Sequence, residues 1–230
     1  IEELEWFRTA QKWASRDRYF HWRLEYPEVF YGSDGVEKDK PGFDAVIGNP
    51  PYIRSRSLDE FQKSYFKSKY DSTTGRWDIY CLFTEKGIEI CTGSISYIQP
   101  SMFLRRPYGE GLRKVISERS HVTEIVELSD VQVFGEATNY VCILSLSNNT
   151  SEDEFVVYTP DPNDYETLDR ERMKNYNLNN SDLSKKPWDV IPAPVANVLG
   201  SFSDDLVTLD KVTKSISQGI DTSKDEVYFV

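Results

Sequence analysis

The sequence predicts an α/β fold with a mixed sheet whose far edge turns antiparallel. Between residues 43 and 128, segments with a strand pattern alternate with segments of helical periodicity. Two further strand patterns, 138–146 and 154–158, then follow with no helix between them. Strands separated by helices pair in parallel, whereas consecutive strands pair antiparallel. These two observations together predict the mixed sheet.

The separate elements have recognisable signals along the chain. Residues 2–18 carry apolar side chains at helical spacing, and the aromatic segment 20–30, interrupted by Pro27, is expected to be extended and packed. After a polar loop at 32–42, a short apolar run predicts a buried strand that prolines end. The remaining patterns predict helices at 58–69, 78–91 and 107–119, and strands at 43–48, 94–99 and 122–128.

The composition changes twice along the chain. Residues 1–159 carry the α/β pattern, and 160–190, rich in Asp, Asn, Lys and Pro, is expected to be a linker or exposed excursion. Residues 191–230 resume a mixed pattern and are expected to begin a second domain. Because the first residue is Ile1 and the last four resemble an interrupted strand, we expect this chain to be a piece of a longer protein.

The composition excludes several classes of protein. The 230 residues are 39% hydrophobic, which is enough for a core, and the formal net charge of −11 argues against broad electrostatic coating of DNA. There is no 18-residue apolar run and no secretory signal, so we expect a cytoplasmic protein without a membrane span. The three cysteines fit reduced, buried thiols, and with only two histidines we expect no metal site.

The motif Asn49-Pro50-Pro51-Tyr52 carries the clearest chemistry. It follows a predicted strand, and ligands of open α/β sheets bind beyond the carboxyl ends of strands. Neither proline has an N–H, so the backbone there offers acceptors without competing donors. The Asn49 side-chain oxygen and the Pro50 carbonyl can hold both hydrogens of adenine N6 and stabilise positive charge developing on it. Tyr52 would stack on the base after it is flipped out of the duplex. The alternative is that the motif is only a turn after a strand.

Several motifs in order resemble the adenine-specific DNA methyltransferases of the γ motif order, especially the methyltransferase part of type IIG restriction–modification enzymes. Residues 43–52, Phe-Asp-Ala-Val-Ile-Gly-Asn-Pro-Pro-Tyr, are similar to motif IV. Residues 20–30 resemble a phrase found just upstream of it in the type IIG group. Matches to motifs V, VI and VIII follow at 78–85, 96–103 and 133–140.

The resemblance implies a partial Rossmann-like methyltransferase fold that uses S-adenosylmethionine and acts on double-stranded DNA. It implies that Asn49 and Pro50 bind the target amine, that Pro51 shapes the loop near the methyl donor, and that Tyr52 stacks on the base. A second aromatic residue would close the base pocket, with Tyr140 the first candidate and Phe134 the alternative. The cofactor adenine would lie against Phe83, His21 and Trp22.

These additional roles have simpler alternatives. Phe83 on an apolar helix face and Tyr140 in an alternating strand can both be core residues, and His21 between aromatics can be a packed neutral histidine. Basic residues outnumber acidic ones by six to three in residues 54–77 and by five to two in 101–119. Those stretches flank the motif and suit phosphate contacts, but they also fit solvated helix faces.

The sequence departs from the family at both ends. No strand–glycine loop–helix pattern that could hold the methionine end of the cofactor precedes Asn49, so we expect weak cofactor binding and no activity from this chain alone. Residues 217–230 resemble the start of a target recognition domain, and no nuclease motif is present.

Two other functions stay open at this stage. The same tetrapeptide serves protein glutamine-N5 methyltransferases that modify release factors, and the chain can also be a non-catalytic DNA-binding or interaction fragment. The DNA recognition sequence and the oligomeric state do not follow from the sequence.

Overall fold

The computed structural model describes residues 4–17, 20–129, 131, 133, 134, 140–161, 168–188 and 190. The chain divides into two units, 1–190 and 191–230, and all the described residues belong to the first. The expected start of a second domain at 191–230 therefore lies outside the described residues.

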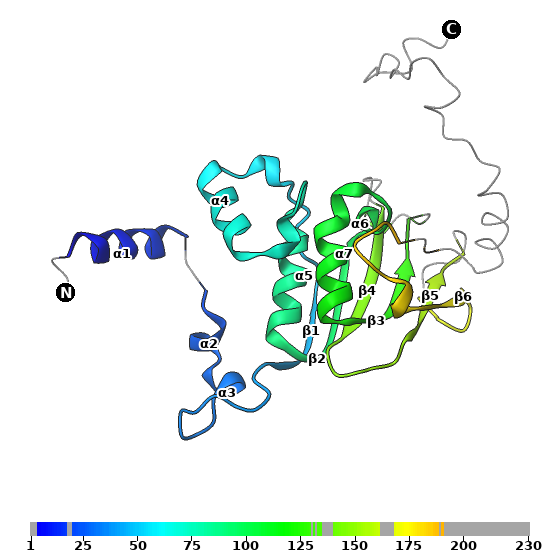
Figure 1. Cartoon of the computed structure of the whole chain (residues 1–230), viewed down its shortest axis with the longest axis horizontal. Helices are drawn as coiled ribbons and strands as arrows, with labels where there is room; N and C mark the ends of the chain where they lie inside the picture. Colours follow the sequence, from blue (N-terminus) through cyan, green and yellow to red (C-terminus); the bar gives the residue numbers. More distant parts are fainter. Residues whose placement is uncertain are drawn as a thin grey trace, which may run out of the picture. The chain divides into compact units, whose positions relative to one another are not determined.

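Seven α-helices and six strands form the described part (Figure 1). Helices α1 to α7 span Glu5–Asp17, Trp22–Glu25, Pro27–Phe30, Glu60–Lys69, Ile79–Ile90, Met102–Arg105 and Glu110–Arg119. Strands β1 to β6 span Phe43–Gly48, Cys91–Pro100, His121–Glu127, Val141–Ser147, Glu154–Thr159 and Lys174–Asn179.

The six strands form one mixed sheet in the order β1-β2-β4-β3-β5-β6. Parallel pairing joins β1 to β2 and β3 to β5, whereas β4 runs antiparallel to both β2 and β3, and β6 runs antiparallel to β5. The α/β prediction is confirmed, although β4 lies inside the sheet and the antiparallel edge belongs to β6. As a result β1, β2, β3 and β5 all end at one side of the sheet, where β4 and β6 begin. We call this side the strand-end edge.

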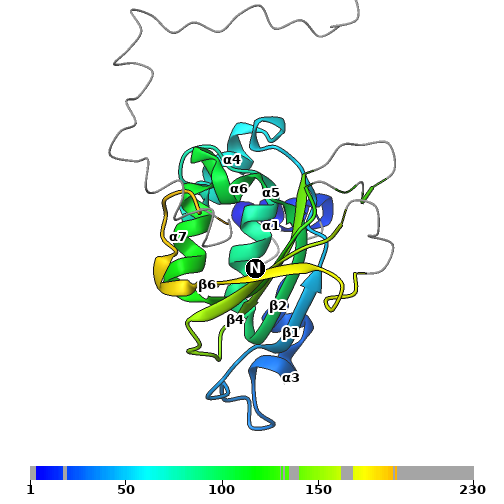
Figure 2. The same cartoon turned by 90° about the vertical axis from the view of Figure 1, so that its right-hand side faces the viewer.

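The main core lies between the sheet and the helices α5 and α7, which cover one face (Figures 1 and 2). On α7, Leu112, Val115 and Ile116 follow the i, i+3, i+4 spacing of one helix face, and each is at most 1% exposed. The short helix α6 adds Phe103 and Leu104, which are both fully buried. We call this cluster the helix-side core. Inward side chains of the strands complete it, among them Ile95, Ile125, Leu144, Phe155 and Val157.

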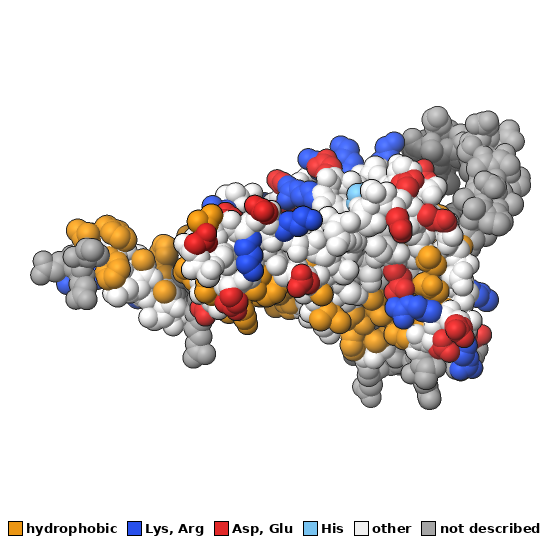
Figure 3. Space-filling model, turned by 90° about the horizontal axis from the view of Figure 1, so that it is seen from below, with side chains coloured by type: hydrophobic (Ala, Val, Ile, Leu, Met, Phe, Trp, Pro, Cys, Tyr) orange, Lys and Arg blue, Asp and Glu red, His pale blue; other side chains and the backbone are white. Residues whose placement is uncertain are grey.

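The opposite face of the sheet is less apolar. A small cluster around Val126, Val141 and Met173 lies toward the strand-end edge, while Ser96 and Ser145 share a hydrogen bond of 3.0 Å farther along. No described strand pairs with the outer edge of β1, and Ile47 on that strand is 86% exposed. The expectation of a buried strand at 43–48 is therefore wrong, because no residue of β1 is buried. Exposed hydrophobic side chains form a band along the lower margin of Figure 3.

Residues 20–30 differ from the expected extended segment. They form the two short helices α2 and α3, and Pro27 is the first residue of α3, a position where its missing N–H costs nothing. The rings of Trp22, Tyr26 and Phe30 pack around Phe43, with centroid separations between 5.6 and 5.9 Å. The expectation of packed aromatics therefore holds, whereas that of extended backbone is wrong.

The description of 160–190 as a linker or exposed excursion is wrong for its second half. Residues 174–179 form β6, and their alternation places Tyr176 and Leu178 against the helix-side core. Farther along, the Trp188 side chain is 2% exposed, its backbone N–H donates to Leu104 O at 2.7 Å, and its ring meets Phe103. The segment is polar because β6 is an edge strand, which needs apolar residues on one face only.

Candidate functional site

The motif loop Asn49–Tyr52 leaves β1 at the strand-end edge. The last residue of the strand, Gly48, pairs with Tyr97 of β2, and a Cβ at Gly48 would lie 3.1 Å from the Tyr97 ring. Such a contact is tighter than most, so the close approach of the ring favours glycine there. The loop thus begins from a strand fixed by parallel pairing, at the side of the sheet where α/β proteins bind ligands.

Two hydrogen-bond acceptors at the start of the loop are free. The Asn49 side chain is exposed, whereas Pro50 is buried and so anchors the loop. Within the described part of the chain, neither the Asn49 side chain nor the Pro50 carbonyl takes part in a hydrogen bond. Polar groups held on rigid backbone without a partner are available to a ligand that donates two hydrogens.

Tyr52 turns toward the face of the sheet opposite α5 and α7. Its hydroxyl donates to the Ile98 carbonyl at 3.2 Å, and its ring meets Phe134 edge to face with centroids 6.4 Å apart. Partial burial raises the pKa of Tyr52, so the phenol stays neutral. The structure therefore joins Tyr52 to Phe134, the alternative candidate for the second aromatic.

Tyr140, the first candidate for that role, lies beside the strand-end edge without a ring contact to Tyr52. Its side chain is 52% exposed, and its carbonyl accepts from the Ser101 N–H at 3.0 Å. It immediately precedes β4, whose first residue pairs with Pro100 of β2. Tyr140 is thus an open ring at this edge, in contrast to the core role that its strand pattern would also allow.

A backbone contact that sequence reasoning missed holds the other end of the loop. The Ile79 N–H donates to Ile53 O at 2.9 Å, and the Ser55 N–H donates to Trp77 O at 3.3 Å. Trp77 is 2% exposed and therefore fixes this short pairing to the core. Asp78, between them, is half-buried, and that burial raises its pKa although Arg54 and Arg56 act in the opposite direction. No local pattern marks such a pairing, because it joins segments more than 20 residues apart.

A hydroxyl network also lies at the strand-end edge. Ser101 and Ser129 share a hydrogen bond of 2.9 Å, and Ser129 in turn donates to the Glu127 carboxylate. Arg105 approaches the other carboxylate oxygen at 3.5 Å. The network joins the ends of β2 and β3, and isolated serines gave no signal for it in the sequence.

Phe83 fits a role in binding a flat apolar ring. It is 46% exposed on α5, while its neighbours Leu82 and Thr84 are buried. It lies one helical turn beyond Ile79, which is bonded to the segment after the motif loop. An exposed phenylalanine on a mostly buried helix leaves an open apolar surface close to the loop, which would suit the adenine ring of a cofactor.

His21 and Trp22 are not brought to this edge. Trp22 packs against Phe43, the first residue of β1, whereas Asn49 follows the last. Six strand residues at about 3.3 Å each separate these ends by roughly 20 Å. Figure 1 likewise shows α3 where β1 begins and α4 beyond its other end. The Trp22 ring packs in the aromatic cluster around Phe43, and the exposed His21 precedes it in the chain, so neither residue lies beside Asn49.

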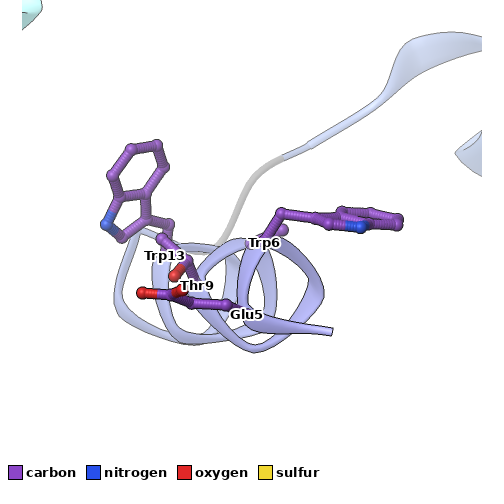
Figure 4. Close-up of a pocket in the computed structure, with 5 residues that line it drawn as sticks. Glu5, Trp6, Thr9 and Trp13 are labelled. Carbon is purple, nitrogen blue, oxygen red and sulfur yellow. The ribbon is translucent and has the colours of Figure 1, made fainter. Parts of the chain in front are cut away.

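Neither the surface hollow on α1 nor any metal-type side-chain cluster among the described residues offers a second candidate site. A shallow hollow on α1 is lined only by residues of that helix, and Trp6 and Trp13 point away from each other there (Figure 4). Among the described residues no group of three or more His, Cys, Asp or Glu side chains is arranged to hold a metal ion. None of the described helices is long and apolar enough to cross a membrane.

Comparisons with known proteins agree on one family. A family model described as Eco57I restriction-modification methylase matches residues 2–134. The chain is 28% identical over 194 residues to the type II restriction enzyme and methyltransferase RM.Eco57I of Escherichia coli, covering 81% of this chain and 19% of that protein. It is 27% identical over 231 residues to the type II methyltransferase M.BstVI of Geobacillus stearothermophilus, covering 91% and 41%.

A solved structure shares the fold. The type IIG restriction endonuclease BpuSI matches with a TM-score of 0.51 and 14% identity, over 80% of this chain and 23% of that one. The chain spans about a fifth of the length of RM.Eco57I and about two fifths of the length of M.BstVI.

Proposed function

Because the chain belongs to the Eco57I restriction-modification methylase family, we propose that it forms the amine-binding part of an adenine-N6 DNA methyltransferase of the type IIG kind. The observation that carries this proposal is a pair of acceptors without a partner among the described residues, the Asn49 side-chain oxygen and the Pro50 carbonyl, on a paired strand end beside aromatic rings. A planar amine with two hydrogens is the ligand that such a pair binds.

The proposed mechanism is electrostatic. Adenine N6 is a weak nucleophile because its lone pair is delocalised into the ring. When Asn49 and Pro50 accept its two hydrogens, they draw the nitrogen toward tetrahedral geometry and stabilise the positive charge that develops during methyl transfer. Because Pro50 is buried and anchors the loop, its backbone would need little reorganisation during the reaction. Pro51 fixes the backbone between the amine site and Tyr52.

The aromatic residues would hold the flipped base. Tyr52 offers the stacking face, with Phe134 already beside it, while Tyr140 offers an open ring on the same edge. Because the Tyr52 and Phe134 planes are inclined by 69°, one of them has to turn before a base can lie flat between them. We favour Phe134 as the second aromatic of the pocket, since Tyr52 contacts it.

S-Adenosylmethionine would supply an electrophilic methyl group when bound. Of the residues that the resemblance implied for its adenine, Phe83 fits and is kept, whereas His21 and Trp22 lie at the other end of β1.

The described cysteines, Cys81, Cys91 and Cys142, are free and buried, and burial raises the pKa of the Cys81 thiol to about 12. Buried, unreactive thiols together with a DNA substrate favour a cytoplasmic protein.

The experiment is methyl transfer by the full-length protein from tritium-labelled S-adenosylmethionine. Double-stranded DNA and release factors are offered in parallel reactions. The proposal predicts label in DNA, with N6-methyladenine as the modified base. Label in protein alone would favour the glutamine-N5 alternative, and no transfer to either would favour a non-catalytic DNA-binding role. Label in another DNA base would contradict the assignment to adenine.

A further inference from the structure

The described arginines fall into two groups. Most hold a partner: Arg23 pairs with Glu37 at 2.6 Å, Arg170 with Glu124 at 2.7 Å, and the buried Arg113 donates to three carbonyls. Within the described residues, the guanidinium groups of four exposed arginines have no hydrogen bond or ion pair, namely those of Arg54, Arg56, Arg76 and Arg106. An unpaired guanidinium keeps all five donors available.

The fold brings the segments carrying the four arginines together. The backbone of Arg54 forms a β-bridge with that of Asp78, and the Ser55 N–H donates to Trp77 O. Arg76, the residue before Trp77, therefore lies next to this paired segment. Arg106 lies on the segment that leads into α7, and Gly111 in the first turn of α7 packs against the backbone of Ser72 and Thr74, just before Arg76. Three chain segments, 53–56, 76–79 and 105–108, thus meet where the motif loop passes toward α4.

The backbone under this group is rigid. Trp77 is 2% exposed, Phe103 and Leu104 are fully buried, and Arg113 holds the carbonyls of Phe103 and Arg106. Guanidinium groups on fixed backbone lose less freedom when they bind than groups on a mobile loop.

The neighbouring carboxylates do not neutralise these arginines. Asp71 binds Arg119, Glu60 binds Lys63, and the Asp59 side chain caps α4. Asp78 interacts with Arg54 and Arg56, but it is a single half-buried group for the whole cluster. The surface therefore carries a net positive charge, although the protein as a whole is acidic.

We propose that Arg54, Arg56, Arg76 and Arg106 bind backbone phosphates of the DNA duplex on either side of the flipped base. This inference rests on the proposed function for its choice of nucleic acid. The planar fork of arginine matches a phosphate group, and such contacts fix the register of a protein on DNA without reading its sequence. They lie beside the loop that takes the base, which is where a duplex must be held while one nucleotide leaves it.

The test measures binding of the full-length protein to a fluorescent DNA duplex over a range of salt concentrations. Replacing Arg54, Arg56, Arg76 or Arg106 singly with glutamine should weaken binding about threefold to tenfold. Each substitution should also reduce the slope of log affinity against log salt by about 0.9, equally for duplexes with and without the recognition sequence. Arg23→Gln removes a paired arginine and is the matched control, with an unchanged slope. Thermal melting of each variant confirms that it is folded.

The outcomes separate this inference from the proposed function. The inference would be overturned if all four variants kept the affinity and the salt slope of the parent. It would also be overturned if the variants bound poly-glutamate, an acidic polymer without phosphate, more weakly than the parent but bound DNA as well as the parent. If the parent protein transfers no methyl group to DNA but the four variants lower the salt slope, the proposed enzyme activity fails while the phosphate surface stands. With methyl transfer intact, the KM for DNA should rise in the four variants, since these arginines hold the duplex.

Discussion

The helix-side core and the strand-end edge are built on the same strands, but Arg113 in the core and Asn49 at the edge differ in their hydrogen-bond partners. In the core, Arg113 is 1% exposed and its guanidinium donates to three backbone carbonyls. At the edge, the Asn49 side chain is exposed and has no partner within the described residues. Arg113 thus holds three backbone segments of the core together, whereas the Asn49 side chain is left available to a ligand at the edge where the strands end.

The largest expected effect is on stability and comes from the core. Phe103→Ala removes a fully buried ring that contacts Tyr80 and Trp188, so it should lower the free energy of unfolding by about 3–5 kcal/mol. Urea denaturation monitored by tryptophan fluorescence measures the change. Phe61→Ala, at an exposed ring, is the control and should cost much less. Similar losses at both positions would contradict the core described here.

A smaller loss is expected from the polar network that holds residues 71–72. The buried Glu85 carboxylate accepts from the N–H groups of Asp71 and Ser72 and from Arg119. Glu85→Gln turns one acceptor into a donor that faces other donors, and we expect a loss of about 2 kcal/mol in the free energy of unfolding.

Glu89→Gln is the matched control for Glu85, because Glu89 belongs to an exposed pair with Lys86. It should change stability by less than about 0.5 kcal/mol. Equal effects of the two substitutions in chemical denaturation would show that the buried network adds nothing beyond a surface ion pair.

The expected effect is smallest at Tyr52. Tyr52→Phe removes the hydrogen bond to Ile98 O but keeps the ring, so the free energy of unfolding should fall by about 0.5–1.5 kcal/mol. Methyl transfer by the full-length protein should stay within about threefold of the parent rate, since stacking needs only the ring. Tyr52→Ala should lower the rate much further. A large loss of rate in the phenylalanine variant would instead give the hydroxyl a chemical role.

The sequence predicted the parts of the site that local patterns encode. An apolar run that ends at two prolines marked β1 and the motif loop, and helical periodicity marked α4, α5 and α7. It failed where long-range pairing decides: the bridge between Ile53 and Ile79, the edge strand β6, and the return of Trp188 to the core have no local signal. The same limit applies to His21 and Trp22, because only the fold shows at which end of β1 their aromatic cluster lies.

The most direct test compares two asparagines. The Asn49 side chain has no partner within the described residues, whereas that of Asn148 donates to the carbonyls of Ile88 and Cys91, both at 2.8 Å. Methyl transfer and unfolding are measured for Asn49→Ala and Asn148→Ala in the full-length protein. We predict that Asn49→Ala lowers kcat by about 10²–10³-fold with unchanged stability, and that Asn148→Ala lowers stability by about 1–3 kcal/mol with unchanged kcat. Full DNA methylation by Asn49→Ala would contradict the account.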